Sequence, residues 1–392
     1  KARQACDCCH GRKIRCDASM PCSNCKVNRA LCTEGFQPSP LITLGVIKSC
    51  VKAFFTLKYP IMPILERDEV YATLPELHDS PEKYGLITSL CAVVILQSEV
   101  LEPPFDCNAP SSKVFIQETL RARQYCNHVD APSLISVQTS FFLFAALFCV
   151  DKDRSAWFYL REAITLLQVQ HLHEEGTYSG LRDKKYASAC RRTFWLLFIT
   201  ERAYELQRNH PLTLASTISL PTVDSGPEAS VIRGFIDLAS LFGNFDDTFI
   251  SLWDLPPAEP AILPHHFIQL QDVLTLALPD VSQRSEIQQA DLLVTRQWLK
   301  TIVWQLCVAR SFLSSATAHE CMSFNYPIAI SRGIARIAQL LPHKAFEAHG
   351  VGILEKVFDV GCSLVDVLLL HADSIPISAR EVGPRDYLVE LV

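Results

Sequence analysis

The sequence predicts a mostly α protein in which a small cysteine-rich, metal-binding module precedes an all-helical domain. Two observations predict the helical domain: apolar residues recur with helical spacing almost throughout from residue 43, and no clear series alternates apolar and polar residues as half-buried strands do. The third observation predicts the module, because seven of the sixteen cysteines lie within the first 32 residues. A chain of 392 residues, 49% of them hydrophobic, is long enough to bury a core.

The first 32 residues contain two similar halves. With Cys8 left aside, the spacing is Cys-x2-Cys-x6-Cys-x5-Cys-x2-Cys-x6-Cys. A tetrahedral zinc ion takes four ligands, so six thiolates hold two ions only if two sulfurs bridge both. So small a module has almost no apolar core, and bound metal would supply its folding energy, about 10–16 kcal/mol per structural zinc. The predicted ligands of the two Zn²⁺ ions are Cys6, Cys9, Cys16, Cys22, Cys25 and Cys32.

The charge of the chain is divided unequally. Residues 1–34 carry seven basic and three acidic side chains, a net charge of +4, although the whole chain carries −6. The remaining residues therefore carry −10. A basic module on an acidic body is the pattern expected when only the module contacts a polyanion such as double-stranded DNA.

The module resembles the fungal binuclear zinc cluster family, the Zn2Cys6 transcription factors. Asp7 lies in the family's Cys-Asp-x-Cys, Arg12 and Lys13 occupy its basic pair, Asp17 follows the third cysteine, and Pro21 precedes the fourth. This resemblance implies a nuclear, sequence-specific DNA-binding regulator of RNA polymerase II genes.

The resemblance also implies roles for particular residues. The bridging sulfurs would belong to Cys6 and Cys22, and Lys13 would contact base edges of CGG-type sites in the major groove. His10 stands where the family usually has arginine, which removes one permanent positive charge. The expected DNA-contacting residues are His10, Arg12, Lys13, Arg15, Lys26 and Arg29.

A short linker is predicted between module and body. Glycine and two prolines mark residues 35–42, which divides the chain into a DNA-binding module (1–34), a linker (35–42) and a regulatory domain (43–392). No sustained heptad pattern follows Cys32, so no coiled coil is expected there. Three explanations stay open: a monomer, a homodimer formed through the body, or a shortened sequence.

Within the body, apolar residues recur at helical spacing over 153–170, over 190–198 and over 292–313, which predicts a helix in each stretch. Prolines, glycines and polar residues predict breaks at 103–104, 127–132, 176–180, 211–226 and 255–264.

The middle of the body resembles the fungal transcription factor regulatory domain, and regulators of the maltose and amylase activator type. The stretches similar to the regulatory domain are 156–163, 172–175 and 191–202, those similar to the activators are 203–208 and 211–214, and the resemblance covers roughly residues 43–225. The resemblance implies control of carbohydrate-utilisation or secondary-metabolite genes, contacts with transcription coregulators, and a role for a small-molecule inducer. The charged residues Arg191, Arg192, Glu201 and Arg202 could form intrahelical pairs or hold a neighbouring helix, but a solvated charged face is the commoner arrangement.

Catalysis has no support in the sequence. His173-Glu174 and His319-Glu320 lack the second histidine of a His-Glu-x-x-His site, and no phosphate loop or nucleophile elbow is present. The longest apolar run, ten residues, is about half of a membrane span, and no secretion leader is recognised. Neither an enzyme nor a membrane protein is expected. The alternatives are a corepressor-like interaction factor with weak or no DNA binding, and a helical enzyme with an accessory zinc module.

Overall fold

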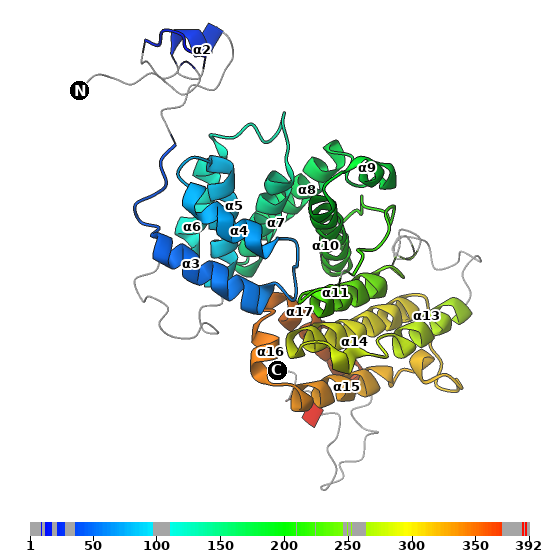
Figure 1. Ribbon diagram of the computed structural model, residues 1–392. Helices are drawn as coiled ribbons and strands as arrows, with labels where there is room; N and C mark the ends of the chain where they lie inside the picture. Colours follow the sequence, from blue (N-terminus) through cyan, green and yellow to red (C-terminus); the bar gives the residue numbers. More distant parts are fainter. Residues whose placement is uncertain are drawn as a thin grey trace. The chain divides into compact units, whose positions relative to one another are not determined.

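The structure is a computed structural model, and all regular elements in the part of the chain that it describes are helices (Figure 1). No strand occurs in that part, which confirms the predicted fold class. The described residues are 9, 12–17, 22–27, 36–96, 110–208, 210–223, 225–245, 249, 252, 264–370, 386–387 and 389.

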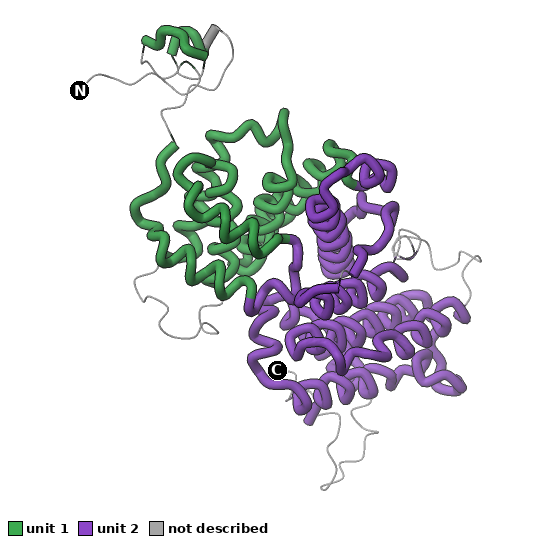
Figure 2. The backbone as a smooth tube through the Cα atoms, viewed as in Figure 1, with its two compact units in different colours: residues 1–55, 65–172 green, residues 56–64, 173–392 purple. Residues whose placement is uncertain are grey.

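The chain forms two compact units (Figure 2). Unit 1 comprises residues 1–55 and 65–172, and unit 2 comprises 56–64 and 173–392. The helices of unit 1 are α2 (Ser23–Val27), α3 (Leu44–Ala53), α4 (Arg67–Thr73), η2 (Leu74–Glu76), α5 (Pro81–Ile95), α6 (Ser112–Arg123), α7 (Leu134–Cys149) and α8 (Asp153–Val169). A short π-helical turn, η1 (Phe54–Lys58), lies where the chain passes from unit 1 to unit 2.

The core of unit 1 is built around α7, which packs against α5 and α8. The helix begins at a capping box, in which Ser133 and Ser136 satisfy each other's backbone N–H groups. It contains all but the last residue of the longest apolar run of the sequence, and Phe141, Phe142 and Leu143 are buried there. Burial among neighbouring helices accounts for this run, and no helix in the described residues is both long and apolar enough to cross a membrane.

Unit 2 is centred on α14 (Glu286–Ala309), which packs against five other helices of the unit. These are α11 (Ala229–Phe242), α13 (Pro264–Leu276), α15 (Tyr326–Leu340), α16 (His343–Glu347) and α17 (Val351–Leu370). The unit also contains α9 (Glu175–Gly180), α10 (Lys184–Arg208), η4 (Val281–Gln283) and η5 (Glu320–Met322).

The structure corrects two of the predicted boundaries. The stretch 176–180 was expected to be a break, but it lies in the short helix α9, where a Cβ atom on either glycine would meet nothing within 4 Å. The late helix was expected to run to residue 313, but α14 ends at Ala309, and Ser311 then adopts a left-handed conformation with φ 57°. The predicted break at 103–104 lies outside the described residues, as does the break predicted at 255–264 except for Pro264, which begins α13.

Candidate metal centre and nucleic-acid interface

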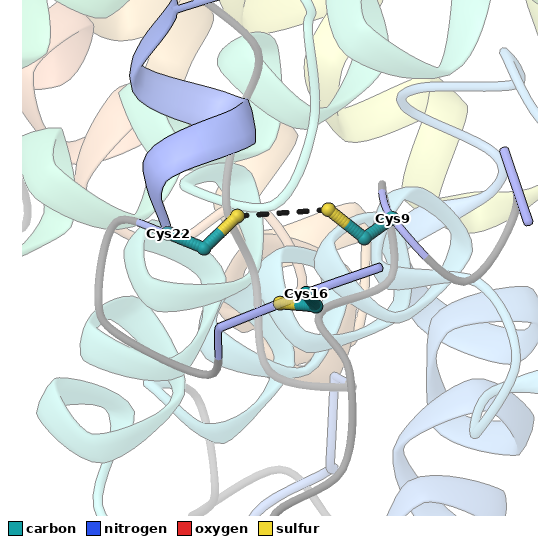
Figure 3. Close-up of side chains that lie close together, drawn as sticks. All are labelled: Cys9, Cys16 and Cys22. Atoms are coloured by element: carbon teal, nitrogen blue, oxygen red, sulfur yellow. Dashed lines mark hydrogen bonds between the residues drawn. The ribbon is translucent and has the colours of Figure 1, made fainter. Parts of the chain in front are cut away.

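Three cysteines from separate segments of the module meet at one point (Figure 3). The sulfur atoms of Cys9, Cys16 and Cys22 all lie within 4.8 Å of one another, and those of Cys9 and Cys22 are 3.6 Å apart. Two thiolates bound to one tetrahedral Zn²⁺ at about 2.3 Å lie about 3.8 Å apart, so the donor set and its spacing fit zinc. Cys9 and Cys22 could therefore share an ion.

These thiols form the core of the module. Cys9, Cys22 and Cys25 are buried together, and Cys16 packs against them. Among the described residues of the module no larger apolar side chain belongs to this cluster, so a bound metal would take the place that a hydrophobic core has in other domains. The predicted ligands Cys6 and Cys32 lie outside the described residues.

Hydrogen bonds between the halves of the module hold the cysteines in place. Helix α2 follows Cys22 directly, and the backbone N–H of Cys25 donates to the Cys22 sulfur at 3.4 Å. The Asp17 carboxylate accepts from the backbone N–H of Ser23 at 3.0 Å and also from its hydroxyl. Asp17 thus ties the residue after the third cysteine to the start of α2, which explains a structural need for an acidic residue there.

The basic loop between Cys9 and Cys16 presents its cations to solvent. Arg12, Lys13 and Arg15 are exposed, and the turn closes with a hydrogen bond from the Ile14 N–H to the Cys9 carbonyl. Lys13 has a left-handed backbone with φ 53°, which is uncommon for a residue other than glycine. Among the described residues none of these three side chains makes an ion pair, so their charges are available to a polyanion.

For the other three predicted DNA-contacting residues the structure does not describe the side chain. Lys26 lies in α2, where the structure describes the backbone alone. His10 and Arg29 lie outside the described residues.

The charged residues of α10 are largely structural, and the expected solvated face is wrong for three of the four. Arg192, Glu201 and Arg202 are buried. The Glu201 carboxylate accepts from the backbone N–H groups of Thr213 and Leu214 at 3.0 and 2.9 Å. Arg202 donates to the Leu214 carbonyl at 2.9 Å, so Glu201 and Arg202 together fasten the 211–214 stretch to α10.

Arg191 is the exception on α10, because it pairs with the half-exposed Glu175 through two hydrogen bonds of 2.8 Å. The Arg191 guanidinium is the main cause that lowers the pKa of Glu175 to about 2, so the pair is charged at neutral pH.

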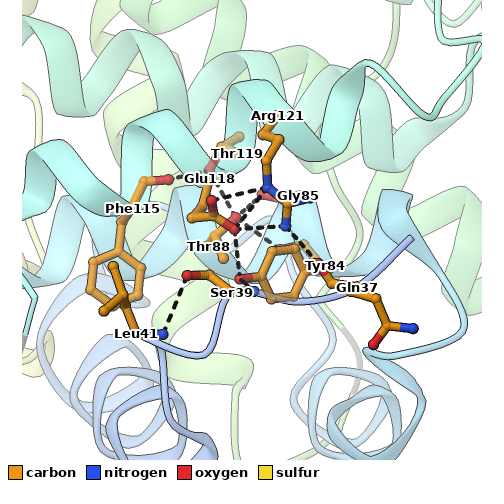
Figure 4. Close-up of polar contacts among 10 residues, drawn as sticks. All are labelled: Gln37, Ser39, Leu41, Tyr84, Gly85, Thr88, Phe115, Glu118, Thr119 and Arg121. Atoms are coloured by element: carbon orange, nitrogen blue, oxygen red, sulfur yellow. Dashed lines mark hydrogen bonds and ion pairs between the residues drawn. The ribbon is translucent and has the colours of Figure 1, made fainter. Parts of the chain in front are cut away.

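The predicted linker is packed on unit 1 (Figure 4), a feature that the sequence reasoning missed. The Phe36 ring is buried, with its centroid 5.2 Å from that of Tyr84 and 5.5 Å from that of Tyr125. The backbone N–H of Ser39 donates to the Tyr84 hydroxyl at 3.2 Å, and Arg121 donates to the Gln37 carbonyl at 2.7 Å. The one sign of this packing in the sequence is Phe36, a large apolar residue between Gly35 and the prolines at 38 and 40.

Glu118 completes this contact. Its carboxylate accepts from the Tyr84 hydroxyl at 3.2 Å and from Arg121 at 2.8 Å. Burial is the main cause that raises the pKa of Tyr84 to about 12, so the hydroxyl keeps the proton that it donates. We call residues 36–39, with Tyr84, Glu118 and Arg121, the linker latch.

Comparison with known proteins assigns both parts of the chain to one class of regulators. The model of the Fungal Zn(2)-Cys(6) binuclear cluster domain matches residues 4–40, and that of the Fungal specific transcription factor domain matches residues 51–235. No solved structure matches the chain.

Two curated relatives cover nearly the whole chain. The probable sucrose utilization protein SUC1 of Candida albicans is 27% identical over 94% of this chain and 79% of its own length. The maltose fermentation regulatory protein MAL13 of Saccharomyces cerevisiae is 23% identical over 97% of this chain and 87% of its own length. The zinc-compatible thiols, the exposed basic loop and the two matched domains together show that the chain belongs to the fungal Zn2Cys6 transcription factors, DNA-binding regulators whose cluster holds two zinc ions.

Proposed function

We propose that this protein acts in the nucleus and regulates RNA polymerase II transcription of carbohydrate-utilisation genes by binding CGG-type DNA sites. Residues 1–34 would be the DNA-binding module, 35–42 the linker and 43–392 the regulatory domain. The observation that carries the proposal is the exposed basic loop beside the thiol cluster. The names of the two relatives support the choice of carbohydrate genes.

We assign the residues of the module as follows. The six cysteines of the predicted spacing hold the two zinc ions, and Lys13 donates to base acceptors such as guanine O6 and N7. Arg12 and Arg15 neutralise phosphates, which positions the module without reading sequence. The remaining assigned contacts are His10, Lys26 and Arg29.

In this proposal zinc holds the module folded, and side chains of the module make the contacts with DNA. When bound, the two ions hold the thiolates together and neutralise most of their charge. The turn from Cys9 to Ile14 then fixes where the basic loop leaves the cluster. The Asp17 carboxylate accepts two hydrogen bonds from Ser23 and thereby caps α2.

The decisive experiment selects DNA from a random pool with the full chain at two salt concentrations. The wild-type protein should enrich a CGG-containing motif and lose affinity steeply with salt. Lys13→Ala should lose about 1–3 kcal/mol of specific binding and keep two zinc ions. The matched control is Lys48→Ala, which removes an exposed lysine from α3.

Two results would contradict the proposal. Unchanged specificity in Lys13→Ala would remove the base-reading role. Weak, salt-independent binding by the wild-type chain would instead favour a protein-interaction factor, the alternative that the comparisons do not favour.

We further propose that the helical body binds coregulators and a small-molecule inducer. A groove of about 210 Å³ lies between α14 and α17. Trp304, Val308 and Phe324 line its apolar part, and Ser363 and Asp366 supply polar groups. Such a surface suits a sugar, which presents both C–H faces and hydroxyls. A panel of mono- and disaccharides should raise the Tm of the wild type but not of Val308→Trp, and a panel without effect on the wild type would contradict the assignment.

A further inference from the structure

Two neighbouring basic side chains of α14 are withdrawn from solvent and have no acidic partner in the described residues. Lys300 is 9% exposed, and the half-buried Arg296 lies one helical turn before it. No described carboxylate oxygen lies within 4.0 Å of the charged nitrogen atoms of either side chain. Buried lysines and arginines are almost always paired, because an unpaired charge is costly to remove from water. A bound anion would therefore stabilise this part of unit 2.

The hydrogen-bond donors of the pair are only partly used. Arg296 donates from Nη1 to the Ala277 carbonyl at 3.3 Å, but its Nε is enclosed and has no hydrogen-bond partner. The Lys300 ammonium makes no hydrogen bond within the described part of the chain, although the Lys300 carbonyl accepts from the Gln271 amide at 2.9 Å. This ammonium is not among the fully enclosed atoms, so a small ion in solvent can reach it.

The spacing of the two cations suits a tetrahedral anion. Residues four apart on a helix have their Cβ atoms about 5–6 Å apart on the same face. A guanidinium and an ammonium at that spacing can donate to different oxygen atoms of one anion. Helix α13 and the turn η5 pack on α14 and on each other, and Figure 1 shows α13 beside α14. These elements would enclose the anion on two sides.

The ionisable groups around Lys300 do not balance its charge. Asp272 of α13 and Glu320 of η5 act on the ammonium, but both are exposed and lie more than 4.0 Å from it. The Cys321 thiol is uncharged at neutral pH, because burial raises its pKa. Burial, followed by the charge of Arg296, lowers the pKa of Lys300 to about 8. The net effect of the surroundings thus opposes the positive charge.

Ordinary structural roles account for only part of this arrangement. A cation near a helix C-terminus interacts favourably with the last carbonyl groups, and Arg296 does so at Ala277, just beyond α13. Lysine also commonly extends along an apolar surface to keep its ammonium in water. Neither role uses the enclosed Nε of Arg296, and neither requires two cations side by side. One anion shared by both side chains accounts for both features.

A phosphate group matches this pair better than a carboxylate or DNA. Phosphate carries about 1.5 to 2 negative charges at neutral pH, which two cations neutralise, whereas a carboxylate carries one. Duplex DNA cannot reach a lysine that is 9% exposed, and it would also meet a body of net charge −10. A small ion responds mainly to charges within a Debye length of about 8–10 Å.

We propose that Arg296 and Lys300 form a binding site for a phosphate group, carried by inorganic phosphate or by a small phosphorylated metabolite. Its two residues differ from those that line the groove between α14 and α17. The inference goes beyond the proposed function and does not depend on which genes the protein regulates. It gives the regulatory domain a ligand site for an anion.

Calorimetric titration of the full chain with inorganic phosphate at constant ionic strength tests the proposal. The wild type should bind phosphate, whereas Lys300→Met should bind it at least about tenfold more weakly, because it loses the ammonium and keeps most of the apolar stem. The matched control, Lys344→Met, removes an exposed lysine from α16 and should bind phosphate like the wild type.

Thermal unfolding separates binding at the site from a general salt effect. Phosphate favours the folded state of most proteins because it is excluded from their surface, so only the rise in Tm that Lys300→Met loses reports the site. Without phosphate, Lys300→Met should have a higher Tm than the wild type, because it no longer buries an unpaired charge. A cooperative transition of this variant establishes that it is folded.

The pH dependence gives an independent readout. The site needs the protonated ammonium, so phosphate affinity should fall as the pH rises above about 8, the pKa of Lys300 without ligand. The Cys321 thiol stays neutral at that pH because its pKa is raised. In Lys300→Met the affinity that remains should not show this fall.

Comparison of ligands identifies the source of the phosphate group. A sugar phosphate that binds more tightly than inorganic phosphate, in the wild type but not in Lys300→Met, identifies a phosphorylated metabolite as the ligand. Equal binding of the two identifies a site for the phosphate group alone.

Three outcomes would overturn the proposal. The first is a wild-type chain that does not bind any of these phosphates at neutral pH. The second is Lys300→Met that binds phosphate as tightly as the wild type. The third is acetate that binds as tightly as phosphate, since the site would then have no preference for a doubly charged anion.

Discussion

At the scale of single residues, Arg202 is a charged side chain whose role is structural, because it is buried and connects separate segments of the chain by hydrogen bonds. It is 1% exposed, and its guanidinium lies 3.4 Å from the centre of the Phe198 ring. It donates to the carbonyls of Phe245 and Leu214, both at 2.9 Å. A buried cation is costly unless its donors are satisfied, and the planar fork of arginine satisfies two separate carbonyls at once.

Arg202→Lys is therefore expected to lower the free energy of unfolding by about 2–4 kcal/mol, although the charge is retained, because an ammonium cannot reproduce the fork. Urea denaturation measures the change. The control is Arg191→Lys, whose half-exposed pair with Glu175 contributes at most about 1 kcal/mol. Equal effects of the two substitutions would show that the fork of Arg202 is unimportant.

The sequence predicts the roles of the cysteine ligands but not the structural role of Arg202. The cysteine ligands could be predicted because zinc chemistry restricts both residue type and spacing, and the structure brings Cys9, Cys16 and Cys22 together. The burial of Arg202 could not be predicted, since its partners are backbone carbonyls 12 and 43 residues away. A carbonyl is present at every residue and leaves no signal in the sequence.

At the scale of elements, the linker latch makes the predicted linker part of unit 1. The Tyr84 hydroxyl stands at its centre, accepts from the Ser39 N–H and donates to Glu118. Three residues, 33–35, separate Cys32 from the packed Phe36. A chain of this length spans at most about 14 Å between the two Cα atoms, so the latch limits how far the zinc module can reach.

Tyr84→Phe is expected to loosen the latch and keep the ring packing. Loss of the hydroxyl leaves the Ser39 N–H without its acceptor, at a local cost of about 1–2 kcal/mol. Hydrogen exchange at Ser39 should accelerate about 5- to 30-fold. Tyr125→Phe is the matched control, because that hydroxyl makes no hydrogen bond to the described residues, and acceleration in both variants would contradict the assignment.

Helix periodicity predicts that elements exist better than it predicts their surroundings. The stretch 153–170 was expected to be a helix, and α8 spans Asp153–Val169. For α17, however, apolar residues occur on both faces, so no pattern in the sequence distinguishes the face that packs on α14 from the face that exposes Leu354 and Phe358. That distinction depends on contacts between distant segments.

At the scale of the whole molecule, two different sources of stability occur in one chain. The described core of the zinc module consists of thiols, whereas α7 and α14 are surrounded by large apolar side chains. Structural zinc contributes on the order of 10 kcal/mol per ion to folding in small modules. Metal and hydrophobic burial thus stabilise different parts of the protein.

Zinc removal from the full chain by a chelator should consequently abolish specific DNA binding and leave the helical body folded. Far-UV circular dichroism should retain almost all of its helical signal, with an unchanged urea midpoint, while zinc release and DNA binding change together. Cys22→Ser should reproduce this result without a chelator, because it removes a buried sulfur of the cluster. Its matched control, Cys362→Ser, alters an exposed thiol of α17 and should retain both zinc ions. Loss of body helicity on zinc removal would show instead that the metal stabilises the whole chain, and DNA binding that survives zinc removal would contradict the role of the cluster.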